Sequence, residues 1–281
     1  MIRIIKSLYH LNIRQKTIAI IMSTFLMLLV LISSGVLIDI DNIQINLAEK
    51  NQPPSLNHLF GTDWLGRDMF SRTIKGLSLS FGVGILAAFT STIIALLLSV
   101  LSSWSKTTDR IVTWLIDLFL SVPHLVTLIL ISFAVGGGFK GVVIGLSLTH
   151  WPALTRLLRA EVMQIKNAEY VAVSKKIGKS KLWIARHHFL PHLLPQLTVG
   201  FILLFPHAIL HEAAITFLGF GLSSESPAIG IILSESMKYL SLGLWWLAFF
   251  PGLALLFMVV IFDSLSRNIR ILVNPFNGQR S

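Results

Sequence analysis

The chain has 281 residues, of which 54% are hydrophobic and only 13% are charged, and its mean hydropathy is +0.75. An ordinary soluble domain carries about 25% charged residues, so this composition excludes that class and predicts a polytopic membrane protein. The formal net charge of +10 does not indicate a nucleic-acid ligand, because the cations stand in blocks between apolar segments without interleaved aromatic residues. The absence of cysteine excludes disulfides, thiolate metal sites and a cysteine nucleophile.

Six apolar segments predict transmembrane helices, over residues 17–38, 79–104, 111–135, 142–158, 193–220 and 244–262. The first follows a basic stretch but lacks a small-residue cleavage site, so we expect a retained span rather than a removed signal peptide. We expect a kink at Pro123 in the third span and an interruption at residues 150–152 in the fourth. Most of the 23 lysines and arginines fall on the inside if both termini are cytoplasmic, as the positive-inside rule favours.

A polar segment ahead of the second span combines glycines with charged residues. Gly61 and Gly66 have the spacing of a phosphate-binding loop, but Arg67 and Asp68 stand where that loop needs Lys and Ser or Thr, so a nucleotide site is excluded. The run closely resembles the GTD-x-x-GRD-x-x-SR signature of ABC transporter permeases of the dipeptide, oligopeptide and nickel group. The matching residues are Gly61, Thr62, Asp63, Gly66, Arg67, Asp68, Ser71 and Arg72.

A basic loop joins the fourth and fifth spans, and its charge places it on the cytoplasmic side. It predicts two short helices, over 170–177 and 181–189, with a break at Gly178 and prolines at Pro191 and Pro195 leading back to the membrane. One interpretation is an ordinary basic loop that only sets topology. The other is a docking site for a partner protein.

The same loop resembles the EAA loop of ABC importer permeases, in which Glu-Ala-Ala precedes, by fixed spacings, a Gly, an Ile and a Leu-Pro pair. Gly178, Leu190 and Pro191 match this pattern, whereas residues 172–174 depart from Glu-Ala-Ala and His188 stands at the Ile position. By this resemblance the residues that would couple the chain to an ATPase are Glu169, Tyr170, Val171, Ala172, Val173, Ser174, Lys175, Gly178, Leu190 and Pro191.

Several ionisable residues fall inside predicted spans, where they need partners or water. His207 and His211 are four residues apart, so they can share one helix face, beside Glu212. They would either line a transport path, contacting a polar solute or metal chelate, or hydrogen-bond across the helix bundle. Glu212 begins the run EAAITFLG, which resembles the E-A-A-x-S-F-L-G run of the same permease group. This resemblance implies a structural or gating function for Glu212 at a packed bend. We expect Asp117 and Pro123 to support packing or a hinge.

A second histidine group, His187, His188 and His192, lies in the basic loop. Solvated imidazoles beside cations are commoner there than metal ligands, so no metal site is predicted. Zinc-protease and serine-hydrolase patterns are both absent from the sequence, which weakens an intramembrane hydrolase.

The resemblance implies an all-α, six-helix transmembrane domain of a type I ABC importer, as the second (C-type) permease of a pair. The chain would divide into residues 1–77 (cytoplasmic tail, first span and signature), 78–267 (permease core, with the coupling loop at 160–192) and 268–281 (cytoplasmic tail). Its implied partners are a second homologous permease, two cytosolic ATPases that bind ATP and Mg, an extracytoplasmic solute-binding protein and the lipid of a prokaryotic plasma membrane. The chain itself would bind no cofactor and carry no catalytic site.

The resemblance implies import of di- or oligopeptides, or of nickel or another metal chelate such as a metallophore, and the nine histidines slightly favour the chelate. The alternative is a proton-coupled secondary transporter that uses Asp117, Glu212 and histidines. That alternative predicts inverted repeats, which the sequence does not show.

Overall fold

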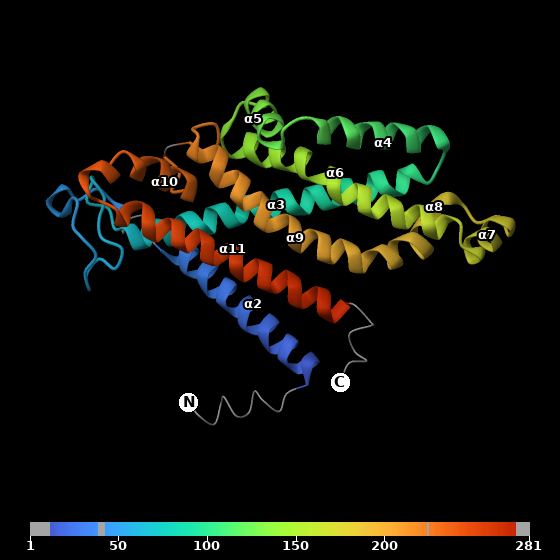
Figure 1. Cartoon of the computed structure of the whole chain (residues 1–281), viewed down its shortest axis with the longest axis horizontal. Helices are drawn as coiled ribbons and strands as arrows, with labels where there is room; N and C mark the ends of the chain where they lie inside the picture. Colours follow the sequence, from blue (N-terminus) through green and yellow to red (C-terminus); the bar gives the residue numbers. More distant parts are fainter. Residues whose placement is uncertain (1–11, 39–42, 224, 274–281) are drawn as a thin grey trace. The chain divides into compact units, whose positions relative to one another are not determined.

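The computed structural model describes residues 12–38, 43–223 and 225–273, and these residues are almost wholly helical (Figure 1). The helices are α2 (Ile13–Leu37), α3 (Met69–Ser102), α4 (Lys106–Ser121), α5 (His124–Ala134), α6 (Gly138–Lys166), α7 (Glu169–Lys176), α8 (Lys181–Ile184), α9 (Leu190–Phe217), α10 (Ile229–Met237) and α11 (Trp246–Val273). A π-helical turn at Ala185–Phe189 joins α8 to α9, and 3-10 turns lie at Leu47–Glu49 and Leu240–Leu242. The two predicted tails lie largely outside the described residues.

Four helices in the described part of the chain are long and apolar enough to cross a membrane: Arg14–Leu37, Met69–Ser102, Lys181–Phe217 and Trp246–Leu272. The pair α4 and α5 passes the same test when taken together. Helix α6 has 29 residues and is therefore about 44 Å long, enough for a bilayer. The predicted all-α membrane fold is confirmed, and the six predicted spans correspond to α2, α3, the α4–α5 pair, α6, α9 and α11.

The third predicted span is broken rather than kinked. Helices α4 and α5 are bent by 100° relative to each other. Val122 between them is extended, with φ −98° and ψ 140°, as expected for a residue that precedes a proline. Pro123 then provides the N-cap of α5, where its missing N–H leaves no helical hydrogen bond unmade.

The interruption predicted at residues 150–152 is wrong, because α6 runs unbroken through Pro152. Proline removes the N–H that would bind the carbonyl of Leu148 one turn earlier. The indole N–H of Trp151 donates to that same carbonyl at 2.9 Å. The residue next to the proline therefore replaces the missing hydrogen bond, which explains why the helix continues.

The chain divides into two compact units, residues 1–82 with 216–281, and residues 83–215. In the described part of the first unit, α2 and α10 each pack on α11. Two aromatic stacks hold the segment before α3: Phe60 lies on Phe250 of α11 with ring centroids 4.6 Å apart, and Trp64 lies at 4.4 Å on Tyr239, between α10 and the 3-10 turn.

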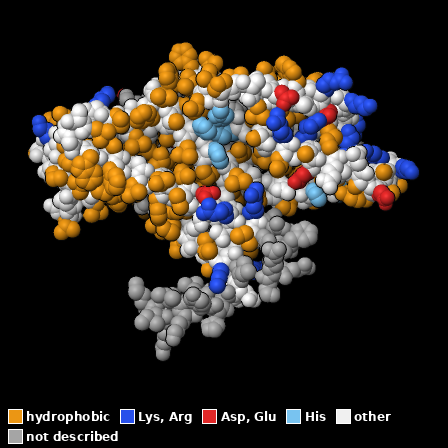
Figure 2. Space-filling model, in the orientation of Figure 1, with side chains coloured by type: hydrophobic (Ala, Val, Ile, Leu, Met, Phe, Trp, Pro, Cys, Tyr) orange, Lys and Arg blue, Asp and Glu red, His pale blue; other side chains and the backbone are white. Residues whose placement is uncertain are grey.

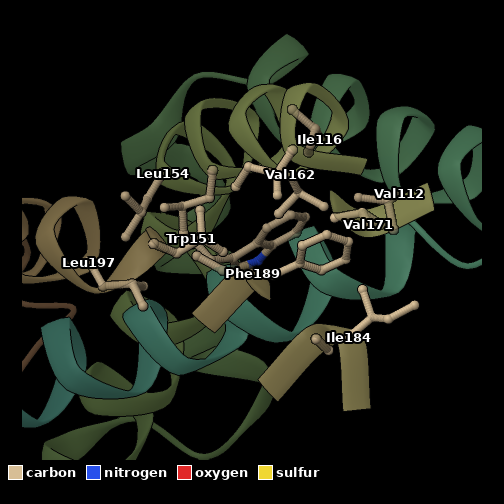
Figure 3. Packing of buried hydrophobic residues seen from close by; sticks show 14 residues of the cluster. Val112, Ile116, Trp151, Leu154, Val162, Val171, Ile184, Phe189 and Leu197 are labelled. Carbon is tan, nitrogen blue, oxygen red and sulfur yellow. The ribbon is translucent and has the colours of Figure 1, made fainter. Parts of the chain in front are cut away.

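In the second unit α6 packs against α4 and α5, and serines of α3 reach its backbone. Ser91 Oγ donates to the carbonyl of Ser147 at 2.9 Å, so the two helices lie close together. A buried hydrophobic core follows this packing (Figure 3) and draws on six helices of the unit and on the π-helical turn. Its members include Val112 and Ile116 of α4, Trp151, Leu154 and Val162 of α6, Val171 of α7, Ile184 of α8, Phe189 and, in α9, Leu197.

Candidate functional sites

Helix α7 has apolar or small residues on both of its sides. Val171 is fully buried in the core and Ser174 is almost so. On the other side Tyr170, Val173 and Ile177 are exposed by 51%, 57% and 66%. These three residues follow the three- and four-residue spacing of one helix face. The buried side anchors the helix, and the exposed side leaves an apolar surface uncovered.

The turn after α7 is a Schellman motif centred on Gly178. Its N–H donates to the carbonyl of Lys175 at 3.0 Å, and the N–H of Lys179 donates to the carbonyl of Ser174 at 3.0 Å. Gly178 has φ +80°, a conformation that glycine adopts without strain. Ser180 then caps α8 by accepting from the N–H of Trp183 at 3.1 Å. The predicted glycine break after the first helix is confirmed. The second predicted helix, 181–189, is not a separate short helix, because the chain is helical from Lys181 to Phe217.

Two of the departures from the EAA pattern, Ser174 and His188, contact each other. Ser174 stands at an alanine position of that pattern and His188 at the isoleucine position. In the structure Ser174 Oγ and His188 Nε2 are 2.9 Å apart, and the imidazole lies near the rings of Tyr170 and Trp183. A polar bond therefore joins α7 to the π-helical turn at a site where the pattern has two apolar residues.

The end of the loop is anchored in the core. Ile184 and Phe189 are buried beside Val171 (Figure 3), and Leu190, which begins α9, packs partly against the same cluster. Pro191 follows the π-helical turn, one residue into α9, and the helix from Lys181 to Phe217 continues through it. A cavity of about 150 Å³ lies beside this anchored end of the loop. Lys166, Lys175 and Lys181 line it together with Ser103, Trp104, Ile184 and Phe189.

The signature ahead of α3 is built around one buried carboxylate. Asp63 is fully buried and its Oδ2 accepts from Arg67 Nε and from Arg72 Nη1, both at 2.7 Å. Its Oδ1 accepts from the backbone N–H groups of Leu65 and Arg67 at 2.9 Å each. Arg72 continues to Glu235 of α10 at 2.9 Å. This network links the signature to α10.

The remaining signature residues close the same segment. Asp68 caps α3 by accepting from the N–H of Ser71 at 2.8 Å, and its other oxygen lies 3.0 Å from His58. Thr62 accepts from the N–H of Gln52 and donates to the carbonyl of Glu49. Gly66 has φ +75°, and a side chain there would overlap the backbone of Asn46. Nearly every matching residue therefore serves the internal structure of this segment.

Asp117 is not a buried group of the helix bundle. Its side chain is 61% exposed and pairs with Arg156 of α6 at 2.8 Å. One turn further along α6, Arg159 binds both oxygens of Asp109, at 2.6 and 2.8 Å. The hydrogen bonds that Arg159 donates to the Asp109 carboxylate raise the pKa of Arg159. Two ion pairs thus connect α4 with α6, and sequence reasoning missed the Asp109 pair.

The histidine pair of α9 does not act as one group. His207 is exposed, whereas His211 lies with His124 of α5 and His150 of α6, one ring nitrogen of each being within 4.8 Å of the others. Sequence reasoning did not identify His124 or His150 as site residues. Glu212 is fully buried and lies inside α9, which continues to Phe217. None of His187, His188 and His192 belongs to the group of three.

Residues 91–270 match the protein family described as "Binding-protein-dependent transport system inner membrane component". The match covers more than half of the chain and includes every residue of the α7–α8 loop. The chain belongs to this family. Its members are permeases of ATP-driven importers, so the predicted family resemblance is confirmed.

Relatives of this permease carry peptide-transport names. It is 32% identical over 231 residues to the dipeptide transport system permease protein DppC of Bacillus subtilis, covering 82% of this chain and 72% of that protein. It is 33% identical over 254 residues to the probable D,D-dipeptide transport system permease protein DdpC of Escherichia coli, covering 90% and 85%. It is 31% identical to the oligopeptide transport system permease protein OppC of Bacillus subtilis, covering 82% and 75%.

The permease also shares its fold with solved ABC importers. A chain of the inward-facing MetNI methionine ABC transporter superposes with a TM-score of 0.60 at 19% identity, covering 73% of this chain and 98% of that one. An amino acid ABC transporter superposes with a TM-score of 0.55 at 15% identity. The fold is therefore that of an ABC importer transmembrane domain, and the relatives' names are those of transport subunits.

Proposed function

We propose that this ABC importer permease moves di- or oligopeptides across the plasma membrane of a prokaryote, powered by cytosolic ATPases that dock on α7 and α8. Peptide import is favoured by its DppC, DdpC and OppC relatives, which are named as peptide permeases. Nickel or metallophore import has no such support from these names. A proton-coupled secondary transporter is not favoured either, because the chain belongs to a family of ATP-driven importers.

One observation carries the docking proposal, namely the exposed apolar row on a loop that is otherwise polar. We call this row the coupling face and define it by Tyr170, Val173, Ile177 and Leu182, the last of which is exposed by 72%. A contiguous exposed apolar patch marks an interaction site. Lys175, Lys176 and Lys179 are exposed in the same segment, so a partner groove with an apolar floor and an acidic rim would complement it.

The remaining partners follow from this function. The chain would pair with a second homologous permease, receive its solute from an extracytoplasmic binding protein, and keep both termini on the ATPase side. ATP and Mg would be bound by the ATPases, and this chain would bind neither. Signature residues such as Asp63 and Arg72 would then hold the fold rather than touch the solute. We assign Glu212 a packing function in α9.

Ile177→Asp tests the docking proposal, because it places a charge in the apolar row without altering a buried residue. We expect the variant to reach the membrane at wild-type levels but to lose co-purification of the co-expressed ATPase, with peptide uptake falling in parallel. Leu56→Asp is the matched control, since Leu56 is 97% exposed and belongs to the other unit. Undiminished ATPase binding by Ile177→Asp would refute the coupling face.

Uptake in cells that carry only this importer tests the solute. We expect a labelled dipeptide to be taken up and chased by unlabelled peptide, while labelled nickel is not accumulated above background. Accumulation of nickel, free or as a chelate, without any peptide uptake would refute the peptide assignment and leave the docking proposal intact.

A further inference from the structure

We propose that His124, His150 and His211 form a binding site for a divalent transition-metal ion. The three residues come from three helices of one unit: His124 begins α5, His150 lies in the middle of α6, and His211 lies near the end of α9. One ring nitrogen from each lies within 4.8 Å of the other two. Imidazole is a preferred ligand of Zn²⁺, Ni²⁺ and Cu²⁺, and three of them converge here.

The hydrogen bonds of the rings leave nitrogen lone pairs available. His150 Nδ1 lies 2.9 Å from the carbonyl of Leu146, and His211 Nδ1 lies 2.8 Å from the carbonyl of His207. A carbonyl only accepts, so each Nδ1 carries the proton and each Nε2 keeps its lone pair. A backbone carbonyl that fixes the second ring nitrogen is also the usual support of a metal-bound histidine.

Two of the ring nitrogens have no protein partner among the described residues. His150 Nε2 and His124 Nδ1 are both buried, and neither makes a hydrogen bond there. His150 as a whole is only 7% exposed, so water has little access to its ring. Buried polar atoms are nearly always satisfied, and an unsatisfied one calls for an explanation. A bound cation would accept both lone pairs.

The distances are compatible with metal binding after small side-chain rotations. A metal–nitrogen bond of about 2.0–2.1 Å places tetrahedral ligand nitrogens roughly 3.3 Å apart. The three nitrogens, now within 4.8 Å, would have to approach by at most about 1.5 Å per pair. The rings already touch, with centroids 4.6 Å apart for His124 and His150 and 4.4 Å for His124 and His211.

Three protein ligands leave one position of a tetrahedral ion open. That position would take water or a donor group of a passing solute. The ion would also link α5 to α6 and α9 within the unit. In Figure 2 a compact group of histidine side chains lies near the middle of this face among mostly hydrophobic side chains, and a further histidine lies apart from it.

His207 shows that a position on the same helix does not by itself make a histidine part of the proposed metal site. It lies one turn before His211, and its Nδ1 makes the same kind of bond, 2.9 Å from the carbonyl of Leu203. Yet His207 is exposed and outside the group of three. It is therefore a matched control that shares the residue type, the helix and the local hydrogen bond of His211 but not the proposed ligand set.

The test is metal binding by the purified full-length permease in nanodiscs, prepared with a tag that contains no histidine and stripped with chelator. We expect Co²⁺ to bind once per chain with the visible absorption of a low-symmetry site, and Zn²⁺ to displace it. His150→Gln and His211→Gln should each weaken the binding at least tenfold, and His207→Gln should leave it unchanged. No saturable binding, or equal weakening by His207→Gln, would overturn the site.

Thermal unfolding keeps the test decisive if His150→Gln does not fold. Zn²⁺ that binds only the folded protein should raise the Tm of the wild type and of His207→Gln. It should not raise the Tm of His124→Gln, in which a partly exposed ligand is removed. A zinc-dependent rise that persists in both His124→Gln and His211→Gln would contradict the site. The result does not depend on whether the transported solute is a peptide.

Discussion

The signature segment, residues 61–72, and the coupling segment, residues 169–191, treat their charged side chains in opposite ways. In the signature segment Asp63 is fully buried and Arg72 is 3% exposed, and the two are directly paired. In the coupling segment Lys175, Lys176 and Lys179 are all exposed. One segment uses its charges to hold itself together, and the other presents them to the surroundings.

This difference shows that the segment with the stronger sequence match need not be the segment that binds a partner. The signature matches its family residue for residue, yet its matching side chains bind one another and α10. The coupling segment matches the EAA pattern only at Gly178, Leu190 and Pro191, yet it carries the exposed apolar row. The matching residues form the turn at Gly178 and the anchored end of the loop. They can position an exposed surface whose own residues differ from the pattern, because those residues need only be accessible.

Among substitutions in the two segments, we expect the largest loss of stability at Asp63. Asp63→Asn removes the charge that compensates two arginines while leaving them in place. Removing one partner of a buried pair costs about 3–5 kcal/mol of unfolding free energy, because the remaining charge stays desolvated. The Tm in detergent and the yield in the membrane should therefore both fall sharply.

Glu235→Gln serves as the control for that substitution. Glu235 binds the same Arg72 but its side chain is 23% exposed, so water can replace part of the lost interaction. We expect a clearly smaller drop in Tm. Equal Tm values for Asp63→Asn and the wild type would show that the buried carboxylate does not hold the segment.

Gly66 and Gly178 sharpen the comparison, because they share a backbone conformation and differ in surroundings. Their φ angles are +75° and +80°, and a non-glycine residue in such a conformation costs about 1–3 kcal/mol. A side chain at Gly66 would also overlap Asn46, whereas nothing lies within 4 Å at Gly178. Gly66→Ala should lower the Tm well beyond Gly178→Ala. Similar Tm values for the two variants would mean that the backbone at Asn46 moves away from the new side chain at little cost.

Much of this architecture follows from local sequence. Apolar length located the spans, and Gly178 located the turn, because both depend on residues adjacent in the chain. The break at Val122 and Pro123 was recognised as a kink, but its 100° angle is not contained in the proline alone. The continuity of α6 was missed, because the indole of Trp151 restores the backbone bond that Pro152 removes.

The sites that depend on distant residues were not predictable in the same way. His124, His150 and His211 are separated by 26 and 61 residues, so no spacing rule joins them. The His207 and His211 pair was visible because it obeys the four-residue helix spacing, yet only His211 belongs to the group. Similarly, the bond between Ser174 and His188 crosses a turn, and each residue looked like an isolated departure.

Within the coupling segment we expect a moderate effect from that bond. Ser174→Ala and His188→Ala should each lower the free energy of unfolding by about 1 kcal/mol, the net worth of a hydrogen bond. A double-mutant cycle based on Tm in detergent should show that the double variant loses less than the sum. Additive losses would mean that the two side chains do not interact in the folded protein.

The smallest effect should distinguish the two ion pairs between α4 and α6. Asp109→Asn removes both hydrogen bonds to Arg159, whose side chain is only 26% exposed. Asp117→Asn removes a single contact to Arg156, where both side chains are more than half exposed. An exposed pair contributes about 0–1 kcal/mol, and salt screens it further, so we expect almost no change in Tm for Asp117→Asn and a measurable fall for Asp109→Asn. Raising the salt concentration should reduce the difference in Tm between the two variants only partly, because the bidentate pair is less accessible to ions.

A larger fall in Tm for Asp117→Asn than for Asp109→Asn would contradict this order. It would mean that Asp117 is not exposed in the assembled transporter, as it would be if a second permease covered it.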